Sequence, residues 1–300
     1  MTGEHSKNQT QTRDTFGFKW AKRDTYESPA VLAEWKRWLL EKYLDNEPAN
    51  LEKILIRKPS RILDAGCGSA VSGTLFFGDS LNDHEYVGVD ISDAVNVARD
   101  RFTEMGLPGT FVQSDLKTIP EELGKFDVIF SEGVLHHTDS VKDAIAALAP
   151  RLTPEGYFLF YVYSKKAPIR EFTDDYVREA ISDMSDDEAW EALKPLTRLG
   201  KVLGDLDVEF EVPDDIPILG IEKGTYNLQR FFFYKICKAF YRPEYSEDEM
   251  NHINFDWFRP HNCYRHTPEE IGDFCAAAGL QVERMHVGES GIAVIARPGR

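Results

Sequence analysis

Short apolar segments alternate with helical patterns through the middle of the chain. The apolar segments have the length and composition of buried strands, and they lie at 61–65, 85–89, 109–113, 126–131 and 156–163. Helical patterns lie between them at 69–78, 92–105 and 141–151. Strands that alternate with helices predict an α/β fold with a doubly wound, mostly parallel sheet.

The C-terminal region predicts the end of the same sheet. Thr267 and Glu270 form a capping box with a proline at the first helical position, and Gly279 suits the left-handed end of the helix. Two strand patterns follow at 280–287 and 291–297. We expect them to form an antiparallel hairpin that completes a seven-stranded sheet.

Residues 164–263 separate these two parts. Apolar spacing around 171–183, 187–203 and 226–241 predicts a mostly helical insertion. The insertion leaves the carboxyl end of the fifth strand, and ligands bind at the carboxyl ends of strands in such sheets. We therefore expect it to form a cap over the site.

The most informative short segment is 61–68, where an apolar strand runs into Asp64 and then into two glycines. Gly66 and Gly68 have no Cβ, so they tolerate unusual dihedral angles and let a ligand approach the main chain. A dinucleotide fingerprint requires a third glycine at position 71, which is Val71 here. The turn predicts a nucleotide-like ligand and disfavours a dinucleotide.

Polar residues also end the next three strands. Asp90 follows the second strand, Ser114 and Asp115 the third, and Glu132 the fourth. Asp90 has the spacing of a carboxylate that binds two ribose hydroxyls. Because the carboxyl ends of parallel strands meet at one edge, we expect these residues to face one crevice.

In order and spacing, these segments resemble the motifs of the class I S-adenosylmethionine (SAM)-dependent methyltransferases over 61–163 and, less specifically, 264–300. The resemblance implies a Rossmann-like fold with SAM as cofactor. It implies cofactor contacts from the glycine turn and the strand ends, namely Asp64, Gly66, Cys67, Gly68, Asp90, Ile91, Ser114, Asp115, Leu116, Glu132 and Gly133. We expect Asp64 to bind the methionine amino group or support the turn, and the amides of 66–68 to help hold that end of the cofactor.

The N-terminal region divides into two parts. Residues 1–15 are polar and predict a disordered tail, whereas apolar spacing from Val31 to Leu39 predicts a helix. The resemblance implies an aromatic N-terminal lid over the cofactor, which makes Trp20 a candidate cofactor-binding residue; core packing is the alternative. The predicted domains are a tail and helical lid (1–48), a SAM-binding core (49–163 and 264–300) and the cap (164–263).

Two adjacent histidines, His136 and His137, follow the fourth strand and are the candidate catalytic residues. A histidine near its ordinary pKa of about 6.5 can remove a proton from a methyl acceptor. We favour His136 as the base and His137 as a structural residue. Packing beneath the sulfonium is the alternative for both.

Candidate substrate-binding residues lie where the chain enters and leaves the insertion. Arginines there suit an anionic group, and a tryptophan suits an apolar wall. The candidates are Tyr163, Arg170, Trp257, Arg259 and His261. The alternative is packing at the joint between domains. Histidine, cysteine and aspartate residues at 252–266 match no zinc spacing, so we predict no metal.

Composition limits the partners. The net charge of −16 argues against nucleic acid, because phosphate neutralisation requires clustered lysine and arginine. Four cysteines lack a Cys-x-x-Cys pair, and no apolar run reaches the roughly 20 residues that span a bilayer. We therefore expect a cytoplasmic protein without a membrane partner, and the resemblance adds a homo-oligomer.

The predicted function is transfer of a methyl group from SAM to a small-molecule acceptor that bears an anionic or polar group. The reaction would be a direct displacement, with a general base where the acceptor must lose a proton. Two alternatives remain. One is a SAM-binding protein without catalysis, and the other is an NAD-dependent oxidoreductase, which Val71 and Asp64 disfavour.

Overall fold

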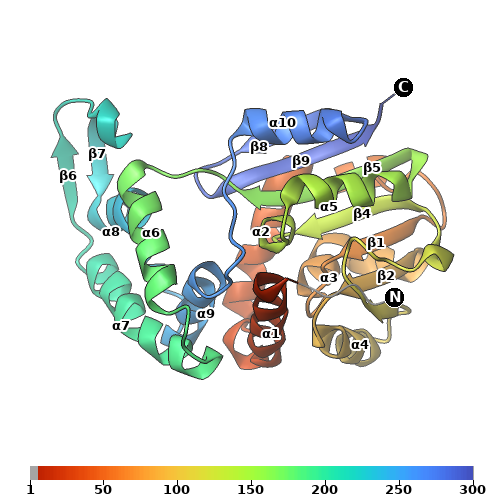
Figure 1. Cartoon of the computed structure of the whole chain (residues 1–300), viewed down its shortest axis with the longest axis horizontal. Helices are drawn as coiled ribbons and strands as arrows, with labels where there is room; N and C mark the ends of the chain where they lie inside the picture. The colour runs from red at the N-terminus through yellow and green to blue at the C-terminus, as the bar shows by residue number, and fades with distance from the viewer. Residues whose placement is uncertain (1–5, 300) are drawn as a thin grey trace. The chain divides into compact units, whose positions relative to one another are not determined.

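The computed structural model describes residues 6–299, which form two compact units (Figure 1). The larger unit contains the residues up to Ala21, Leu32–Ser164 and the chain from Asn262 onward. The smaller unit contains Lys22–Val31 and Lys165–His261. The predicted lid segment is thus divided, because residues 22–31 belong to the smaller unit.

The larger unit is built on a seven-stranded sheet with the order β3-β2-β1-β4-β5-β9-β8. The strands are β1 (Arg61–Ala65), β2 (Glu85–Asp90), β3 (Thr110–Gln113), β4 (Phe126–Glu132), β5 (Leu152–Tyr163), β8 (Leu280–Val287) and β9 (Gly291–Pro298). β1 to β5 are parallel, and β9 is antiparallel to both β5 and β8. The predicted doubly wound sheet is confirmed. Its strand order reverses between β1 and β4, where open α/β sheets bind ligands.

Helices cover both faces of this sheet (Figure 1). Alternate strand residues such as Ile62 and Leu159 pack against α2, α3 and α4. Their neighbours Leu63 and Phe158 pack against α5 and α10. The helices are α2 (Pro29–Leu44), α3 (Val71–Phe77), α4 (Ala94–Met105), α5 (Val141–Leu148) and α10 (Pro268–Ala277). The predicted capping box of α10 is present.

The N-terminal tail is helical, which corrects the expectation of disorder for residues 7–15. Helix α1 spans Lys7–Ala21, and residues 1–5 lie outside the described residues. Its buried side chains are polar, namely Gln9, Thr12, Thr15 and Lys19. A helix that buries polar groups leaves no apolar period in the sequence, so hydrophobic spacing could not reveal it.

The smaller unit contains helices and one short hairpin. The elements are α6 (Pro168–Ala180), α7 (Asp186–Asp205), β6 (Glu209–Val212), β7 (Gly224–Asn227), α8 (Leu228–Phe231) and α9 (Glu247–Phe258). α6 and α7 match predicted helices. The helix predicted at 226–241 is wrong, because β7, the short α8 and a π-helical turn at Phe232–Ile236 occupy most of it. Its run of consecutive aromatic residues has neither helical nor strand periodicity.

Helix α9 lies outside the three helical patterns that we predicted for the insertion. Ser246 and Glu249 cap its start with a reciprocal pair of hydrogen bonds. This Ser-x-x-Glu pattern is visible in the sequence and is typical of the start of a helix. Among residues 6–299, no helix is long and apolar enough to cross a membrane.

Replacing either of two helical glycines by alanine should change the stability of the protein, in opposite directions for the two positions. A Cβ on Gly200 of α7 would lie 2.8 Å from the main-chain oxygen of Ala239, whereas nothing lies within 4 Å of a Cβ on Gly272 of α10. We expect Gly200→Ala to destabilise the protein by about 1–3 kcal/mol through overpacking. Gly272→Ala should stabilise it by up to about 1 kcal/mol, because alanine favours the helix. Urea unfolding would show both effects, and equal stabilities of the two variants would contradict this packing.

Candidate functional site

The glycine turn has a backbone that few residues other than glycine adopt. Gly66 and Gly68 have φ angles of +88° and +49°. A Cβ on Gly66 would lie 2.2 Å from Cγ1 of Val134, so no other side chain fits. The amides of Gly66 and Cys67 donate to the carbonyl of Val89, at 2.7 and 2.9 Å. The turn is thus bonded to the end of the neighbouring strand.

Asp90 bonds the turn from the end of β2. Its Oδ2 accepts the Gly68 amide at 2.9 Å, and its Oδ1 accepts the amide and hydroxyl of Ser92 at 2.8 and 2.7 Å. Burial raises the pKa of Asp90, and these hydrogen bonds oppose that shift. A carboxylate accepts about four hydrogen bonds, so Oδ2 keeps room for one ribose hydroxyl. This geometry revises two expectations: Oδ1 is already filled, and all three amides of 66–68 donate within the protein.

Asp64 lies beneath the turn rather than at its surface. Its Oδ2 accepts the hydroxyl of Tyr86, and both side chains are buried. Burial raises the pKa of Asp64 to about 7, although the Tyr86 hydrogen bond works against the shift. Its contact with the methionine amino group and its support of the turn both stay predictions.

The end of β3 joins the same edge of the sheet. The Ser114 amide donates to the Asp90 carbonyl at 2.9 Å, and its hydroxyl donates to the Thr118 carbonyl at 3.1 Å. Asp115 accepts the Lys117 amide at 2.7 Å and so closes its own turn. Leu116 is buried in the core, and the Ile91 carbonyl accepts the Gln113 side chain.

Glu132 makes contacts that the sequence did not indicate. Its carboxylate is paired with Lys42 and accepts the Tyr43 hydroxyl at 2.6 Å, so it is bonded to α2. Burial, with the Glu132 charge, raises the pKa of Tyr43 well above its ordinary value. The Lys42 ammonium also lies 3.8 Å from the centre of the Tyr161 ring. A cofactor contact of Glu132 stays a prediction, as does one of Gly133, whose φ of +75° ends β4.

Helix α1 lies against the edge that holds the glycine turn. A Cβ on Gly68 would lie 2.5 Å from Nε1 of Trp20, so the indole touches the turn. The Phe16 ring meets the edge of His137, with ring centres 4.9 Å apart. This position is compatible with the predicted lid role of Trp20, which stays a prediction.

The two histidines have different surroundings. His136 is fully buried, and its ring centre lies 3.7 Å from that of Tyr163. The Nδ1 of His137 lies 2.7 Å from the carbonyl of Asn262. A carbonyl only accepts, so Nδ1 carries the proton and Nε2 is the basic atom of the neutral ring. The geometry therefore reverses our preference and favours His137 as the base.

Two of the candidate substrate-binding residues have structural partners in the smaller unit. Arg259 donates to Asp186 at 2.7 Å and to the carbonyls of Ser182 and Met184. Arg170 is buried, and it donates to Asp174 and to the carbonyl of Phe233. Both guanidinium groups are thus used to hold the fold, and their substrate contacts stay predictions.

The other three candidates also have protein contacts. The indole Nε1 of Trp257 donates to Asp174 at 2.8 Å. Nε2 of His261 lies 3.3 Å from the carbonyl of Ser182. Tyr163 packs on His136 in the larger unit. The candidates thus divide between the two units, and their roles stay predictions.

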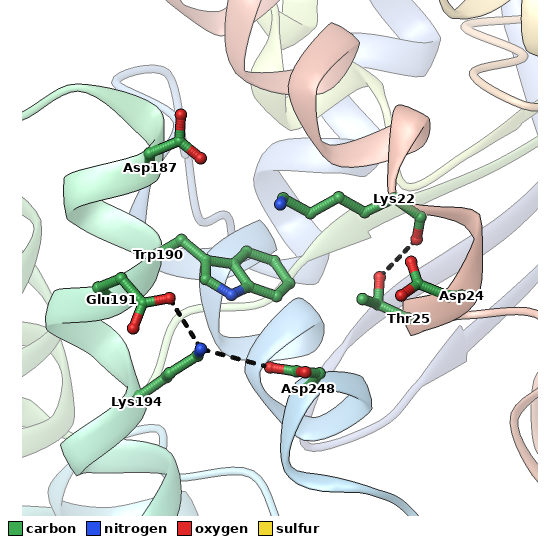
Figure 2. Close-up of a pocket in the computed structure, with 8 residues that line it drawn as sticks. All are labelled: Lys22, Asp24, Thr25, Asp187, Trp190, Glu191, Lys194 and Asp248. Carbon is green, nitrogen blue, oxygen red and sulfur yellow. Dashed lines mark hydrogen bonds and ion pairs between the residues drawn. The ribbon is translucent and has the colours of Figure 1, made fainter.

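A cavity of about 250 Å³ opens in the smaller unit between residues 22–25, α7 and α9 (Figure 2). The Lys22 ammonium lies 5.0 Å from the centre of the Trp190 ring, and Lys194 pairs with Glu191 and Asp248. Charged side chains thus dominate its lining, whereas small-molecule sites are mostly apolar. Among the described residues, no group of three histidine, cysteine or acidic side chains is placed to hold a metal.

Comparison with known proteins bears on this site. Residues 62–156 match the family described as methyltransferase domain. Residues 62–156 are a methyltransferase domain. The predicted membership of the class I SAM-dependent methyltransferases is thereby confirmed for these residues. The match lies wholly within the larger unit.

Two of the curated proteins that are similar to this chain are named as methyltransferases. The chain is 30% identical over 112 residues to a malonyl-acyl-carrier-protein O-methyltransferase of Enterobacter lignolyticus, covering 37% of this chain and 42% of the relative. It is 31% identical over 101 residues to a ubiquinone biosynthesis O-methyltransferase of Marinobacter nauticus, covering 32% and 41%. The chain spans less than half the length of the curated relatives that it matches.

A solved structure shares the fold. Magnesium protoporphyrin IX methyltransferase of Synechocystis, crystallised with bound SAM, aligns with a TM-score of 0.53 at 14% identity. The alignment covers 99% of this chain and 100% of the other. The sheet is therefore that of the Rossmann-like methyltransferase fold.

The raised pKa of Asp64 predicts that the stability of the protein depends on pH. Its pKa is about 7 in the folded protein and about 3.9 in an unfolded chain. The folded state therefore binds more protons between these values, so the contribution of Asp64 to stability is present below pH 4 and is lost as the pH rises through 7. The free energy of unfolding of Asp64→Asn, measured relative to that of the wild type, should therefore rise by roughly 2–4 kcal/mol from pH 5 to pH 8.

Urea unfolding at both pH values measures this gain. Asp79→Asn, an exposed site in the same unit, should show the same difference from the wild type at each pH. A difference for Asp64→Asn that does not change with pH would show that the carboxyl group is ionised as in water.

Proposed function

We propose that this protein binds SAM at the carboxyl edge of its parallel sheet and transfers the methyl group to a small-molecule acceptor that bears an anionic or polar group. One observation carries the proposal. Asp90 is hydrogen-bonded to Gly68, so the carboxylate suited to a ribose and the turn suited to the methionine end form one rigid unit. The turn follows β1, which borders the strand-order reversal of the sheet, and Asp90 ends the neighbouring strand β2.

The chemistry is a displacement at the methyl carbon of a sulfonium, in which alignment of donor and acceptor supplies most of the catalysis. An acceptor hydroxyl or neutral nitrogen must also lose a proton. His137 suits this step, because the Asn262 carbonyl fixes its tautomer and leaves Nε2 to accept the proton. His136, which packs against Tyr163, would support its neighbour.

The acceptor is assigned to the smaller unit. The curated relatives match about a third of this chain and have different named activities, including a tRNA carboxymethyltransferase besides the two O-methyltransferases. The family match ends at residue 156, before the insertion begins. Acceptor choice therefore belongs with residues outside the shared core.

Asp90→Asn should weaken SAM binding by at least about tenfold, because it replaces a charged acceptor by an amide. Asp93→Asn changes an exposed aspartate in the same turn and should bind SAM like the wild type. Equilibrium dialysis measures how tightly the wild type and the two variants bind SAM and NAD. Tighter binding of NAD than of SAM would instead support the oxidoreductase alternative.

His137→Asn should lower the rate of methyl transfer by 10²-fold or more and leave SAM affinity unchanged, because asparagine keeps a donor for Asn262 but loses the base. The assay follows the labelled methyl group from SAM into a metabolite extract, with His286→Asn on β8 as a remote control. An unchanged rate would assign His137 to packing. If the wild type binds SAM and labels no fraction, the protein is a binding protein without catalysis.

A further inference from the structure

An ion pair between Lys42 of α2 and Glu132 of β4 lies at the carboxyl edge of the parallel sheet. The side chains of Lys42 and Glu132 are 18% and 11% exposed, so water screens their charges only weakly. Glu132 is the last residue of β4, which borders the strand-order reversal. The pair therefore lies at the edge where open α/β sheets bind ligands.

Both charged groups keep hydrogen-bonding capacity. The Glu132 carboxylate accepts the Lys42 ammonium and the Tyr43 hydroxyl, whereas a carboxylate can accept about four hydrogen bonds. The Lys42 ammonium has three N–H donors, and within residues 6–299 its one hydrogen bond goes to Glu132. Its other contact is the ring of Tyr161 on β5, at 3.8 Å from the ring centre. An ammonium with unused donors thus lies beside a carboxylate with unused acceptor positions.

The residues on either side of Glu132 contact the end of β1 and the glycine turn. The Ser131 hydroxyl donates to the Ala65 carbonyl at 2.7 Å. The side chain of Val134 lies against Gly66, where it would meet any added Cβ. The end of β4 is thus packed directly beside the turn, and it brings the ion pair to the part of the edge that suits the methionine end of the cofactor.

Space and charge at this place also suit a ligand. A Cβ on Gly133 would meet nothing within 4 Å, so open space borders the residue that follows Glu132. Burial raises the pKa of Asp64 beneath the turn, and the charges of Asp90 and Glu132 add to this rise. The carboxylates at this edge therefore act on one another, and a ligand with a positive group would relieve their repulsion.

We propose that Lys42 binds the carboxylate, and Glu132 the ammonium group, of the amino-acid end of SAM. This inference rests on the proposed function and adds Lys42, which lies outside the family match, to the residues that hold the cofactor. The amino-acid end carries these two opposite charges on one carbon atom. An ion pair can bind both of them and leave no charge uncompensated. Tyr43 and Tyr161 would keep the pair in position through the contacts that they already make.

The test is calorimetric titration of the whole chain with S-adenosylhomocysteine and with methylthioadenosine. Both probes contain an adenosine and a thioether sulfur, but only the first has the amino-acid end. Lys42→Met should weaken the binding of S-adenosylhomocysteine by at least about tenfold and leave that of methylthioadenosine unchanged. Lys42→Arg keeps the charge and should retain most of the affinity. Lys36→Met, which changes an exposed lysine of α2, is the matched control and should bind both probes like the wild type.

Glu132→Gln is a second test, because its amide oxygen still accepts the Tyr43 hydroxyl while the charge is lost. It should weaken the binding of S-adenosylhomocysteine by a similar factor and again spare methylthioadenosine. The double variant Lys42→Met with Glu132→Gln leaves no unpaired charge, so it replaces any single variant that fails to fold.

The outcomes separate this inference from the proposed function. Variants that bind S-adenosylhomocysteine like the wild type, or that lose both probes equally, would show that the ion pair only holds α2 against the sheet. A wild type that binds both probes equally well would also overturn the inference and leave the proposed function in place. A wild type that binds neither probe and does not bind SAM would overturn the proposed function itself.

Discussion

The hydrogen bond between the Asp90 carboxylate and the Gly68 amide joins the two halves of the candidate cofactor site. A buried carboxylate is costly unless it is hydrogen-bonded, and Asp90 meets this requirement with three donors from the protein itself. The same bonds hold the glycine turn in its left-handed conformation. The shape of the turn depends on this carboxylate, and the main-chain carbonyl of Asp90 accepts the Ser114 amide at the end of β3.

Several buried carboxylates around this site have structural partners. Asp64 binds Tyr86 beneath the turn, and Glu132 binds Lys42 and Tyr43 of α2. Such networks are expensive to bury and favour one arrangement when every member is satisfied. They hold the edge of the sheet in a single geometry, which methyl transfer requires because donor and acceptor must be aligned.

The family match lies entirely within the larger unit, which also contains the candidate base His137. In the smaller unit, the cationic groups of Lys166, Arg170 and Lys238 lie over the ring of Trp257. We propose that acceptor choice resides in this unit, outside the matched residues.

The sequence by itself determined the sheet, the glycine turn, the class of the core and the order of the strand ends. These depend on local periodicity and on short motifs, which the printed residues show directly. Only the tertiary structure decided which donors meet which acceptors: that Asn262 orients His137, that Lys42 pairs with Glu132, and that Arg259 binds Asp186. The tertiary structure also decided the polar helix α1, because a helix that buries polar side chains leaves no apolar period in the sequence.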